Sequence, residues 1–441
     1  MQDAVRDYAG GSTARFHMPG HKGFLLPTDV TEITGTDNLH APHDAILRSE
    51  MLCAEALGAK DAFFSVNGST AGILATLFVI GCGKRILLGR NCHKSVINGI
   101  AFAGHETVSI FPDENGIITA EAVDKALSSD PCDAVFITSP TYRGAVSPID
   151  EIARAAHSHG ALLFVDCAHG AHFAFSDRLP PVPSSADAWV ISCHKTLEAY
   201  TQSALLLTGE SFPFSRGRMQ SVINMFQSTS PSYPLMIGIE SSVLEPGDWD
   251  RHIDRITAFR QRLLKLENTV IIGSEDISLQ DPTRLNLAVR GMTGRELGSI
   301  LEKNGIYPEM SDADCVTLIT TPSDPDEWYD RLIATLESIP VKANVDEGSK
   351  LRKTMLGDLR GRRVMSVRDA VSGVRELLAI SEAEGRISAG SVGCYPPGVA
   401  VLFPGETITK GALAFLKEEA DSGAELFGLE NGLIPAVKGT I

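Results

Sequence analysis

Short apolar runs that alternate with helical patterns constrain the fold of this chain more than any other feature. Helical patterns precede and separate these runs, at Ile46–Leu57, Ala71–Ile80, Glu121–Leu127 and Ile149–His157. Strands separated by helices form βαβ units, which give a mostly parallel sheet covered by helices on both faces. The predicted strands are Arg85–Leu88, Thr107–Phe111, Ala134–Thr138, Ala161–Val165, Trp189–Ile191 and Ala204–Leu207.

Further along the chain the pattern predicts a second, smaller α/β unit. Its elements are an amphipathic helix over Asp248–Leu266, strands Thr269–Ile272 and Leu285–Val289, helix Gly294–Asn304 and strand Val316–Thr320. The first 45 residues show no long periodic stretch, and the polar segment Pro340–Lys353 is typical of a linker. After it we expect one helix, Val367–Glu384, and a Pro/Gly-rich block, 394–406. We therefore expect an N-terminal segment (1–45), a large domain (46–240), a small α/β domain (241–340) and a C-terminal domain (341–441).

Charge and cysteine content narrow the choice of partners. The 39 Lys and Arg residues against 55 Asp and Glu give a net charge of −16, which argues against nucleic acid or an anionic membrane as main partner. The longest apolar run, Ala71–Gly83, is too short to span a bilayer, and the N-terminus lacks a signal-peptide pattern. The eight cysteines form no CxxC pair, as expected for reduced thiols. We expect a cytoplasmic protein with a small-molecule substrate.

Two polar residues directly follow predicted strands. Asp166 ends the run Ala161–Val165, and Lys195 comes shortly after Trp189–Ile191. The carboxyl ends of parallel strands meet at the edge where such sheets bind ligands. A lysine there can form a Schiff base with an aldehyde, and a carboxylate can keep the ring nitrogen of pyridoxal phosphate protonated. A helix N-cap for Asp166 and a surface position for Lys195 remain the alternatives.

Two further motifs fit a site for a flat, phosphorylated ligand. The turn Asn67–Thr70 precedes an apolar helix, whose first N–H groups can bind an anion, although an ordinary capping turn is the alternative. The turn matches neither a Walker A loop nor GxGxxG. His93, after the strand at 85–88, either stacks on a flat ring or lies exposed on a loop. His17 and His21 are separated by Pro19-Gly20, which disfavours a helix, so we predict no metal site.

Nine motifs in series resemble the pyridoxal-phosphate-dependent ornithine/lysine/arginine decarboxylases of bacteria. Each motif alone is weak, but together they run in family order from residue 16 to 406. The resemblance therefore covers nearly the whole chain. The motifs are FHMPGHKG (16–23), GTDNLHAP (35–42), NGST (67–70), RNCHKS (90–95), SPTYRG (139–144), VDCAHGAHF (165–173), SCHKTLEAYTQ (192–202), STSPSY (228–233) and CYPPGVAVLFPGE (394–406).

The resemblance implies a fold-type-I α/β enzyme with large, small and C-terminal domains, in the short form that lacks the N-terminal wing domain of larger members. It implies a homodimer with active sites at the subunit interface. The cofactor would be pyridoxal 5'-phosphate, with Lys195 as the Schiff-base lysine, Asp166 beside the ring nitrogen and His93 stacked on the ring. The phosphate would be held by Ser69, Thr70, Ser192 and His194, with Thr229 and Ser230 reaching it from the partner subunit. Two positions depart from the family pattern: Cys167 replaces a glutamate and Glu198 a proline.

The predicted reaction is decarboxylation of a basic amino acid (arginine, lysine or ornithine) to an amine and CO2, in polyamine or diamine metabolism. His169 or Lys195 would supply the proton at Cα. Glu406, at the end of the Pro/Gly-rich block, would pair with the cationic end of the substrate, although an exposed loop glutamate is the alternative. An aminotransferase or lyase with the same cofactor, and a non-catalytic regulatory paralogue, remain open from the residues alone.

Overall fold

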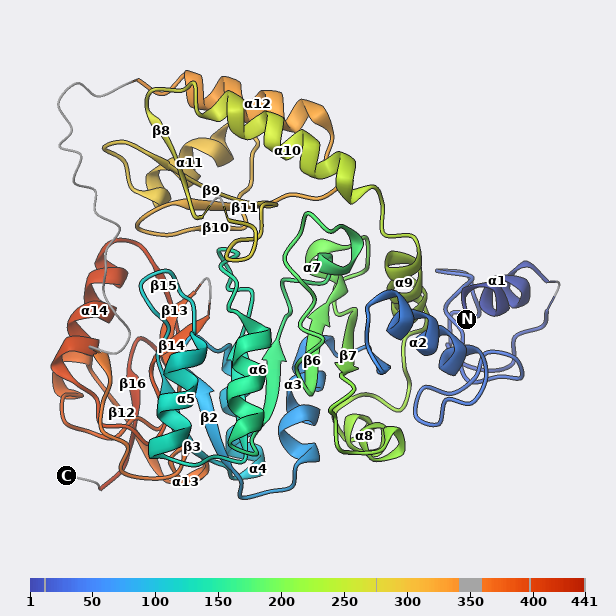
Figure 1. Cartoon of the computed structure of the whole chain (residues 1–441), viewed down its shortest axis with the longest axis horizontal. Helices are drawn as coiled ribbons and strands as arrows, with labels where there is room; N and C mark the ends of the chain where they lie inside the picture. Colours follow the sequence, from blue (N-terminus) through green and yellow to red (C-terminus); the bar gives the residue numbers. More distant parts are fainter. Residues whose placement is uncertain (12, 275, 341–358, 396–397, 440–441) are drawn as a thin grey trace.

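The structure is a computed structural model that describes residues 1–11, 13–274, 276–340, 359–395 and 398–439. Figure 1 shows a large central α/β unit, a small unit above it and a C-terminal unit at its side. Within these described residues, none of the helices combines the length and apolar character needed to cross a membrane.

A seven-stranded sheet forms the centre of the large unit. Its order is β1-β7-β6-β5-β4-β2-β3, in which the five strands from β6 to β3 are parallel and β7 is antiparallel to both neighbours. The predicted mostly parallel sheet is confirmed, but β1 was not predicted. The strands are β1 (Asp61–Ser65), β2 (Arg85–Gly89), β3 (Glu106–Ile110), β4 (Ala134–Thr138), β5 (Leu162–Asp166), β6 (Ala188–Ser192) and β7 (Ala204–Thr208).

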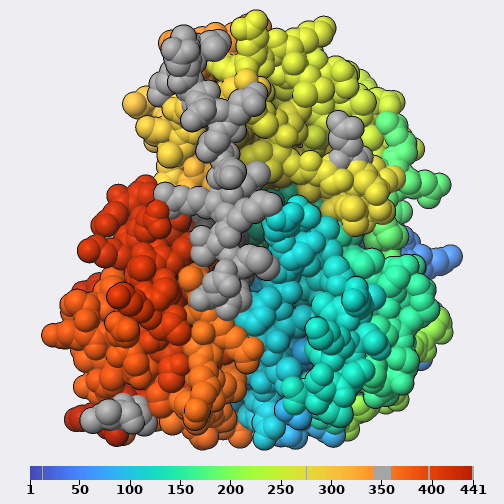
Figure 2. Space-filling view, turned by 60° about the vertical axis from the view of Figure 1, so that its left-hand side comes forward, coloured from blue at the N-terminus to red at the C-terminus, as the bar shows by residue number. Residues whose placement is uncertain are grey.

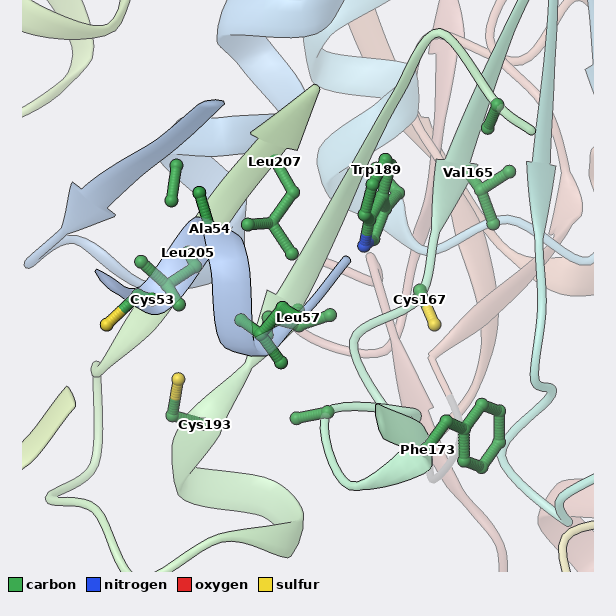
Figure 3. Packing of buried hydrophobic residues seen from close by; sticks show 14 of the residues in the cluster. Cys53, Ala54, Leu57, Val165, Cys167, Phe173, Trp189, Cys193, Leu205 and Leu207 are labelled. Carbon is green, nitrogen blue, oxygen red and sulfur yellow. The ribbon is translucent and has the colours of Figure 1, made fainter. Parts of the chain in front are cut away.

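Alternate residues of these strands point to opposite faces, so the sheet carries two separate cores. Val165, Trp189 and Leu207 belong to one core, whereas Phe164 and Val190 belong to the other. Figure 3 shows part of the first core, with Leu205 close to Cys53 and Ala54 of α2. The first face is covered by α2 (Ala45–Ala56), α5 (Ala120–Ser129), α6 (Ile149–Ser158) and α9 (Tyr233–Leu244), and the second by α3 (Gly68–Val79), α4 (Lys94–Ala103) and α8 (Arg216–Ile223).

The small unit is a four-stranded antiparallel sheet with its own core. The predicted strand Thr269–Ile272 forms with these bounds, and Thr293 and Glu296 form a capping box that begins the predicted helix at residue 294. A two-residue strand, β10, was not predicted. The elements are α10 (Trp249–Leu263), β8 (Thr269–Ile272), β9 (Arg284–Val289), α11 (Gly294–Lys303), β10 (Met310–Ser311), β11 (Val316–Ile319) and α12 (Asp326–Glu337).

The C-terminal unit differs from the prediction in one element. The predicted helix Val367–Glu384 is wrong, because α13 (Val367–Ser372) ends before Gly373 and the chain then forms β12 (Arg375–Leu378). β12 pairs with β16 (Ile434–Val437), a partner that the local pattern does not reveal. In Figure 2 this orange and red unit lies against the cyan large unit. The other elements are η4 (Ile380–Glu382), β13 (Val392–Tyr395), β14 (Val399–Leu402), α14 (Lys410–Asp421) and β15 (Glu425–Phe427). The predicted linker lies, after Pro340, outside the described residues.

The N-terminal segment contains a helix that was not predicted. This helix, α1 (Gln2–Gly10), has only one buried residue, Val5, so its own pattern is weak. Its start is held instead by Glu240, whose carboxylate accepts hydrogen bonds from the N–H groups of Met1 and Gln2. Tertiary contacts therefore favour this helix more than its sequence does.

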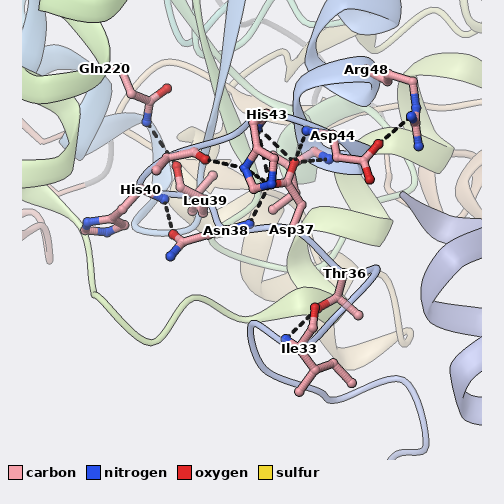
Figure 4. A network of polar contacts seen from close by, with 12 residues as sticks. Ile33, Thr36, Asp37, Asn38, Leu39, His40, His43, Asp44, Arg48 and Gln220 are labelled. Atoms are coloured by element: carbon pink, nitrogen blue, oxygen red, sulfur yellow. Dashed lines mark hydrogen bonds and ion pairs between the residues drawn. The ribbon is translucent and has the colours of Figure 1, made fainter.

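The motif GTDNLHAP closes a loop around one buried carboxylate (Figure 4). Asp37 accepts hydrogen bonds from the backbone N–H groups of Asn38, His43, Asp44 and Ile46. Burial alone would raise the pKa of Asp37, but these donors lower it below its usual value. From this loop, the imidazole Nε2 of His40 contacts the Ser228 carbonyl at 2.8 Å. The motif thus supports the segment that carries Thr229 and Ser230.

Candidate active site

A cavity of about 780 Å³ opens where the three units meet. The large unit contributes the carboxyl ends of β4, β5 and β6, where parallel sheets bind ligands. The small unit contributes residues around β10, and the C-terminal unit contributes residues of β13, β14 and α14. Seven of the predicted site residues line this cavity: Ser69, Thr70, His93, Asp166, Ser192, His194 and Lys195. His169, predicted as a proton donor, lines it too.

Lys195 and His169 form a hydrogen-bonded pair in this cavity. Lys195 lies on α7 (Cys193–Thr196), directly after β6, and its Nζ is 3.0 Å from Nε2 of His169. Burial lowers the pKa of Lys195, and the charge of Arg284 acts in the same direction. Burial also lowers the pKa of His169 well below its usual value, with Lys195 and Arg284 contributing. Burial therefore shifts both groups towards their neutral forms.

Arg284 fixes which nitrogen of His169 carries the proton. Its guanidinium is fully buried and contacts both Nδ1 and the carbonyl oxygen of His169 at 3.2 Å. A guanidinium has no acceptor, so Nδ1 of His169 must accept this hydrogen bond. The proton of the neutral ring then lies on Nε2, and it points to the amine of Lys195.

Asp166 and His93 lie on neighbouring parts of the sheet edge. Asp166 ends β5, is 4% exposed, and accepts a hydrogen bond from the Ala168 N–H on Oδ1 at 3.1 Å. None of the described residues donates to its Oδ2, which leaves one carboxylate oxygen for a ligand. His93 is the N-cap of α4 and contacts the Ser95 hydroxyl through Nδ1 at 2.8 Å. Burial lowers the pKa of His93, and the opposing charge of Asp166 does not reverse this.

The remaining predicted residues surround the N-terminus of α3. Asn67 does not cap this helix, because its side-chain amide donates to the Phe226 carbonyl at 3.1 Å. Ser69 and Thr70 lie in its first turn, and the buried hydroxyl of Ser192 has no partner among the described residues. His194 donates from Nδ1 to the Ser203 carbonyl, which leaves Nε2 without a proton when the ring is neutral. Free N–H groups and hydroxyls at a helix N-terminus suit a phosphate.

Taken together, these groups fit pyridoxal 5'-phosphate. An amine, a buried carboxylate with one oxygen free, an imidazole and an anion-binding helix end are the groups that this cofactor needs for its aldehyde, ring nitrogen, ring face and phosphate. Among the described residues, no group of three His, Cys, Asp or Glu side chains is placed to hold a metal ion.

Three predicted residues do not reach the cavity in one chain. Thr229 and Ser230 are exposed on the loop before α9. Glu406 is only 3% exposed and pairs with Arg90 at 2.7 Å and with Arg363 at 3.0 Å. Two arginines from different segments thus hold the Glu406 carboxylate in a buried ionic contact outside the cavity.

Sequence reasoning missed several residues around the cavity. The Tyr142 ring packs edge-on against His169, with 4.6 Å between the ring centroids, and Tyr142 donates a hydrogen bond to Glu309. Arg143 pairs with Asp312. Tyr142 and Arg143 lie in the SPTYRG motif, which was the available signal, but Arg284 and Glu309 lie in no such motif.

The two positions that depart from the family pattern lie away from the cavity. Cys167 is buried in the core of the large unit, and burial raises the pKa of its thiol. Glu198 accepts a hydrogen bond from Ser323 of the small unit. Neither residue lines the cavity, so neither changes the set of groups around Lys195.

Comparisons with known proteins agree with this arrangement. The major domain of the Orn/Lys/Arg decarboxylase family matches residues 1–279, and the C-terminal domain of the same family matches residues 359–436. An arginine decarboxylase of Bacillus subtilis is 31% identical, with 99% of this chain and 97% of that protein covered. The lysine decarboxylase LdcA of Pseudomonas aeruginosa is 22% identical, with 94% and 74% covered.

The fold is also that of a solved decarboxylase. The structure of the Escherichia coli constitutive lysine decarboxylase superimposes with a TM-score of 0.80 at 18% identity, covering 99% of this chain and 81% of that one. At this identity the likeness shows the fold alone, which is the fold-type-I architecture expected from the motifs.

Proposed function

The chain belongs to the Orn/Lys/Arg decarboxylase family, whose enzymes depend on pyridoxal 5'-phosphate, and we propose that its substrate is arginine. Loss of the α-carboxylate as CO2 and gain of one proton at Cα convert arginine to agmatine, a precursor for polyamine synthesis. The observation that carries the proposal is the cavity itself: its lining combines Lys195, Asp166 and His93 with the carboxylate of Glu309. Relatives named arginine decarboxylase are also more similar to this chain than relatives named lysine decarboxylase.

The cofactor would be held by residues of the large unit. Lys195 would bind its aldehyde carbon covalently, Asp166 would contact the ring nitrogen through Oδ2, and His93 would cover one ring face. Its phosphate would lie at the α3 N-terminus with Ser69, Thr70 and Ser192, and His194 would contact the phosphate through Nε2 only when its ring is protonated. When bound, pyridoxal 5'-phosphate provides an electron sink for the electron pair that CO2 leaves behind.

The Lys195–His169 pair would supply the proton that replaces CO2 at Cα. The Nζ of Lys195 lies 3.0 Å from Nε2 of His169, so the neutral imidazole would hold the amine in place, and the ammonium form of Lys195 would give the proton to Cα. Arg284 holds the imidazole in this orientation from the opposite side. The cavity thus contains an amine, a carboxylate and two imidazoles in the positions that the proposed reaction needs. Their presence favours a decarboxylase over a non-catalytic paralogue.

We also propose that the protein is a homodimer. Support comes from the N-terminal segment, where Phe16, Phe24 and Leu25 are 95%, 92% and 84% exposed. Large apolar side chains exposed together are typical of an interaction surface. Thr229 and Ser230 are exposed and could reach the partner subunit from the loop that His40 supports. The eight unpaired cysteines support a reducing compartment, the cytoplasm.

The division into domains at residues 45, 240 and 340 remains our proposal. Separate hydrophobic cores in the small and C-terminal units support the boundary at 340. The core of the large unit also contains Leu39 of the N-terminal segment and Trp249 at the start of α10, so the boundaries at 45 and 240 rest on the sequence pattern.

The test is to offer arginine, lysine and ornithine together to the purified protein with pyridoxal 5'-phosphate. We expect CO2 release and agmatine as the main amine in mass spectrometry, and neither from the Lys195→Ala variant. Amino-group transfer to a keto acid without CO2 release would establish an aminotransferase instead. Cadaverine or putrescine as the main product would refute arginine as the preferred substrate.

A further inference from the structure

A site for a basic amino acid needs an anion that the enzyme itself leaves unneutralised. Among the described residues, four carboxylates besides that of Asp166 line the cavity: those of Asp113, Glu114, Glu309 and Asp312. The Asp113 carboxylate accepts the N–H groups of Asn115 and Ile117 and so stabilises its own loop. Asp312 is paired with Arg143. Glu114 lies on the same exposed loop as Asp113.

The surroundings of Glu309 differ from those of the other three carboxylates. Its backbone N–H donates to the Thr317 carbonyl at 3.0 Å, which anchors the residue to the hairpin of β10 and β11. The only hydrogen bond that the described residues give its carboxylate comes from the hydroxyl of Tyr142. Burial and the Glu309 charge raise the pKa of Tyr142, so the phenol stays neutral and remains a donor. The phenol orients the carboxylate without cancelling its charge. The charges of Arg284 and Lys195 act on Glu309 from a distance, and neither side chain forms an ion pair with it among the described residues.

A continuous row of side chains connects Glu309 to the reacting end of the cavity. Tyr142 touches Glu309 with its hydroxyl and packs its ring against His169, which contacts Lys195 at 3.0 Å. An extended arginine side chain places its guanidinium carbon about 6 Å from Cα, given bond lengths of about 1.5 Å. The ring centroids of His169 and Tyr142 are 4.6 Å apart and the Tyr142 hydroxyl contacts Glu309, so the row from His169 to Glu309 has a length of the same order.

We propose that Glu309 binds the cationic end of the substrate side chain and thereby selects a basic amino acid. The proposal rests on the proposed function and deepens it. A guanidinium can donate two parallel hydrogen bonds to a carboxylate, and the fixed Tyr142 contact limits the orientations of the acceptor. A neutral side chain of equal length would leave the carboxylate without its cation, which lowers the affinity for such substrates.

The test compares arginine with citrulline, which has the same length but a neutral urea in place of the guanidinium. In Glu309→Gln we expect kcat/KM for arginine to fall about 10²-fold, mainly through KM, and that for citrulline to stay unchanged. Glu302→Gln removes the same charge from an exposed position on α11 and should match wild type with both compounds. Equal losses for arginine and citrulline, or an unchanged arginine KM, would overturn the role of Glu309.

Calorimetric titration of the cofactor-loaded protein with agmatine separates this proposal from the proposed reaction. Agmatine carries the guanidinium but no α-carboxylate to lose. Weaker agmatine binding by about 10²-fold in Glu309→Gln supports the recognition role, even where wild type releases no CO2 and the proposed reaction fails. Equal agmatine affinity of wild type and Glu309→Gln refutes the role, whatever the reaction.

Discussion

The buried ion pair of Glu406 gives a prediction that separates a structural role from a role in substrate binding. The carboxylate joins Arg90 of the large unit to Arg363 of the C-terminal unit, and the Arg90 and Glu406 side chains are 2% and 3% exposed. The Arg90 guanidinium also stacks on Phe403 at 3.8 Å from the ring centre. Replacing Glu406 by Gln removes the charge at nearly constant volume and leaves Arg90 as a buried cation without its counter-ion.

Removal of one partner from a buried ion pair typically costs about 3–5 kcal/mol. We expect the lower end, about 3 kcal/mol, because the amide oxygen of Gln can still accept one hydrogen bond and Arg363 is partly exposed. With an m-value of about 2 kcal/mol per M of urea, this loss lowers the unfolding midpoint by about 1.5 M.

The assay is urea unfolding followed by far-UV circular dichroism, together with the arginine KM of the folded variant. Glu384→Gln, on the exposed surface of the C-terminal unit, is the matched control and should keep the wild-type midpoint. We expect Glu406→Gln to lose stability while its KM stays near that of wild type. An unchanged urea midpoint together with a raised arginine KM would refute this reasoning. That result would instead indicate that Glu406 binds the substrate.

Three further predictions concern the site and the small unit. Asp166→Asn should lower kcat about 10²-fold or more at saturating cofactor, and wild-type turnover would contradict its role at the ring nitrogen. Arg284→Met should allow both neutral tautomers of His169, visible in its imidazole 15N chemical shifts; an unchanged Nε2–H tautomer would show that Arg284 does not set it. Burial lowers the pKa of His252 to about 4 from 6.5, so the unfolded chain binds more protons between these values and stability falls as pH drops through that window. The urea midpoint should therefore fall from pH 7 to pH 5, and less steeply in His252→Gln.

The predicted site residues that the structure brings together in the cavity share one property. Asp166 ends a parallel strand, and Lys195 and His93 closely follow one, so their position at the sheet edge depends only on recognising the strand. The α3 turn with Ser69 and Thr70 is set by an equally local pattern. Because the carboxyl ends of neighbouring parallel strands lie at the same edge of the sheet, these residues come together once the strands are recognised.

The errors have the opposite origin, since each depends on a partner far away in the chain. α1 is anchored by Glu240, and β12 exists because β16 pairs with it some sixty residues later. The surroundings of Glu406 also depend on a distant partner. A glutamate after a Pro/Gly-rich block has no local sign that Arg90, over three hundred residues away, will neutralise it.

Glu309 shows why a specificity residue is harder to predict than a cofactor residue. It precedes a strand of only two residues, and it reaches the cavity because the small unit places the β10–β11 hairpin next to the Tyr142 loop. That placement depends on contacts such as those of the Gln280 and Asn286 side chains with the Arg143 carbonyl, which no periodicity reveals. The groups proposed to hold the cofactor all come from one sheet edge, whereas the group proposed to bind the substrate side chain comes from a second unit. Substrate choice can therefore change through the small unit while the groups around Lys195 stay in place.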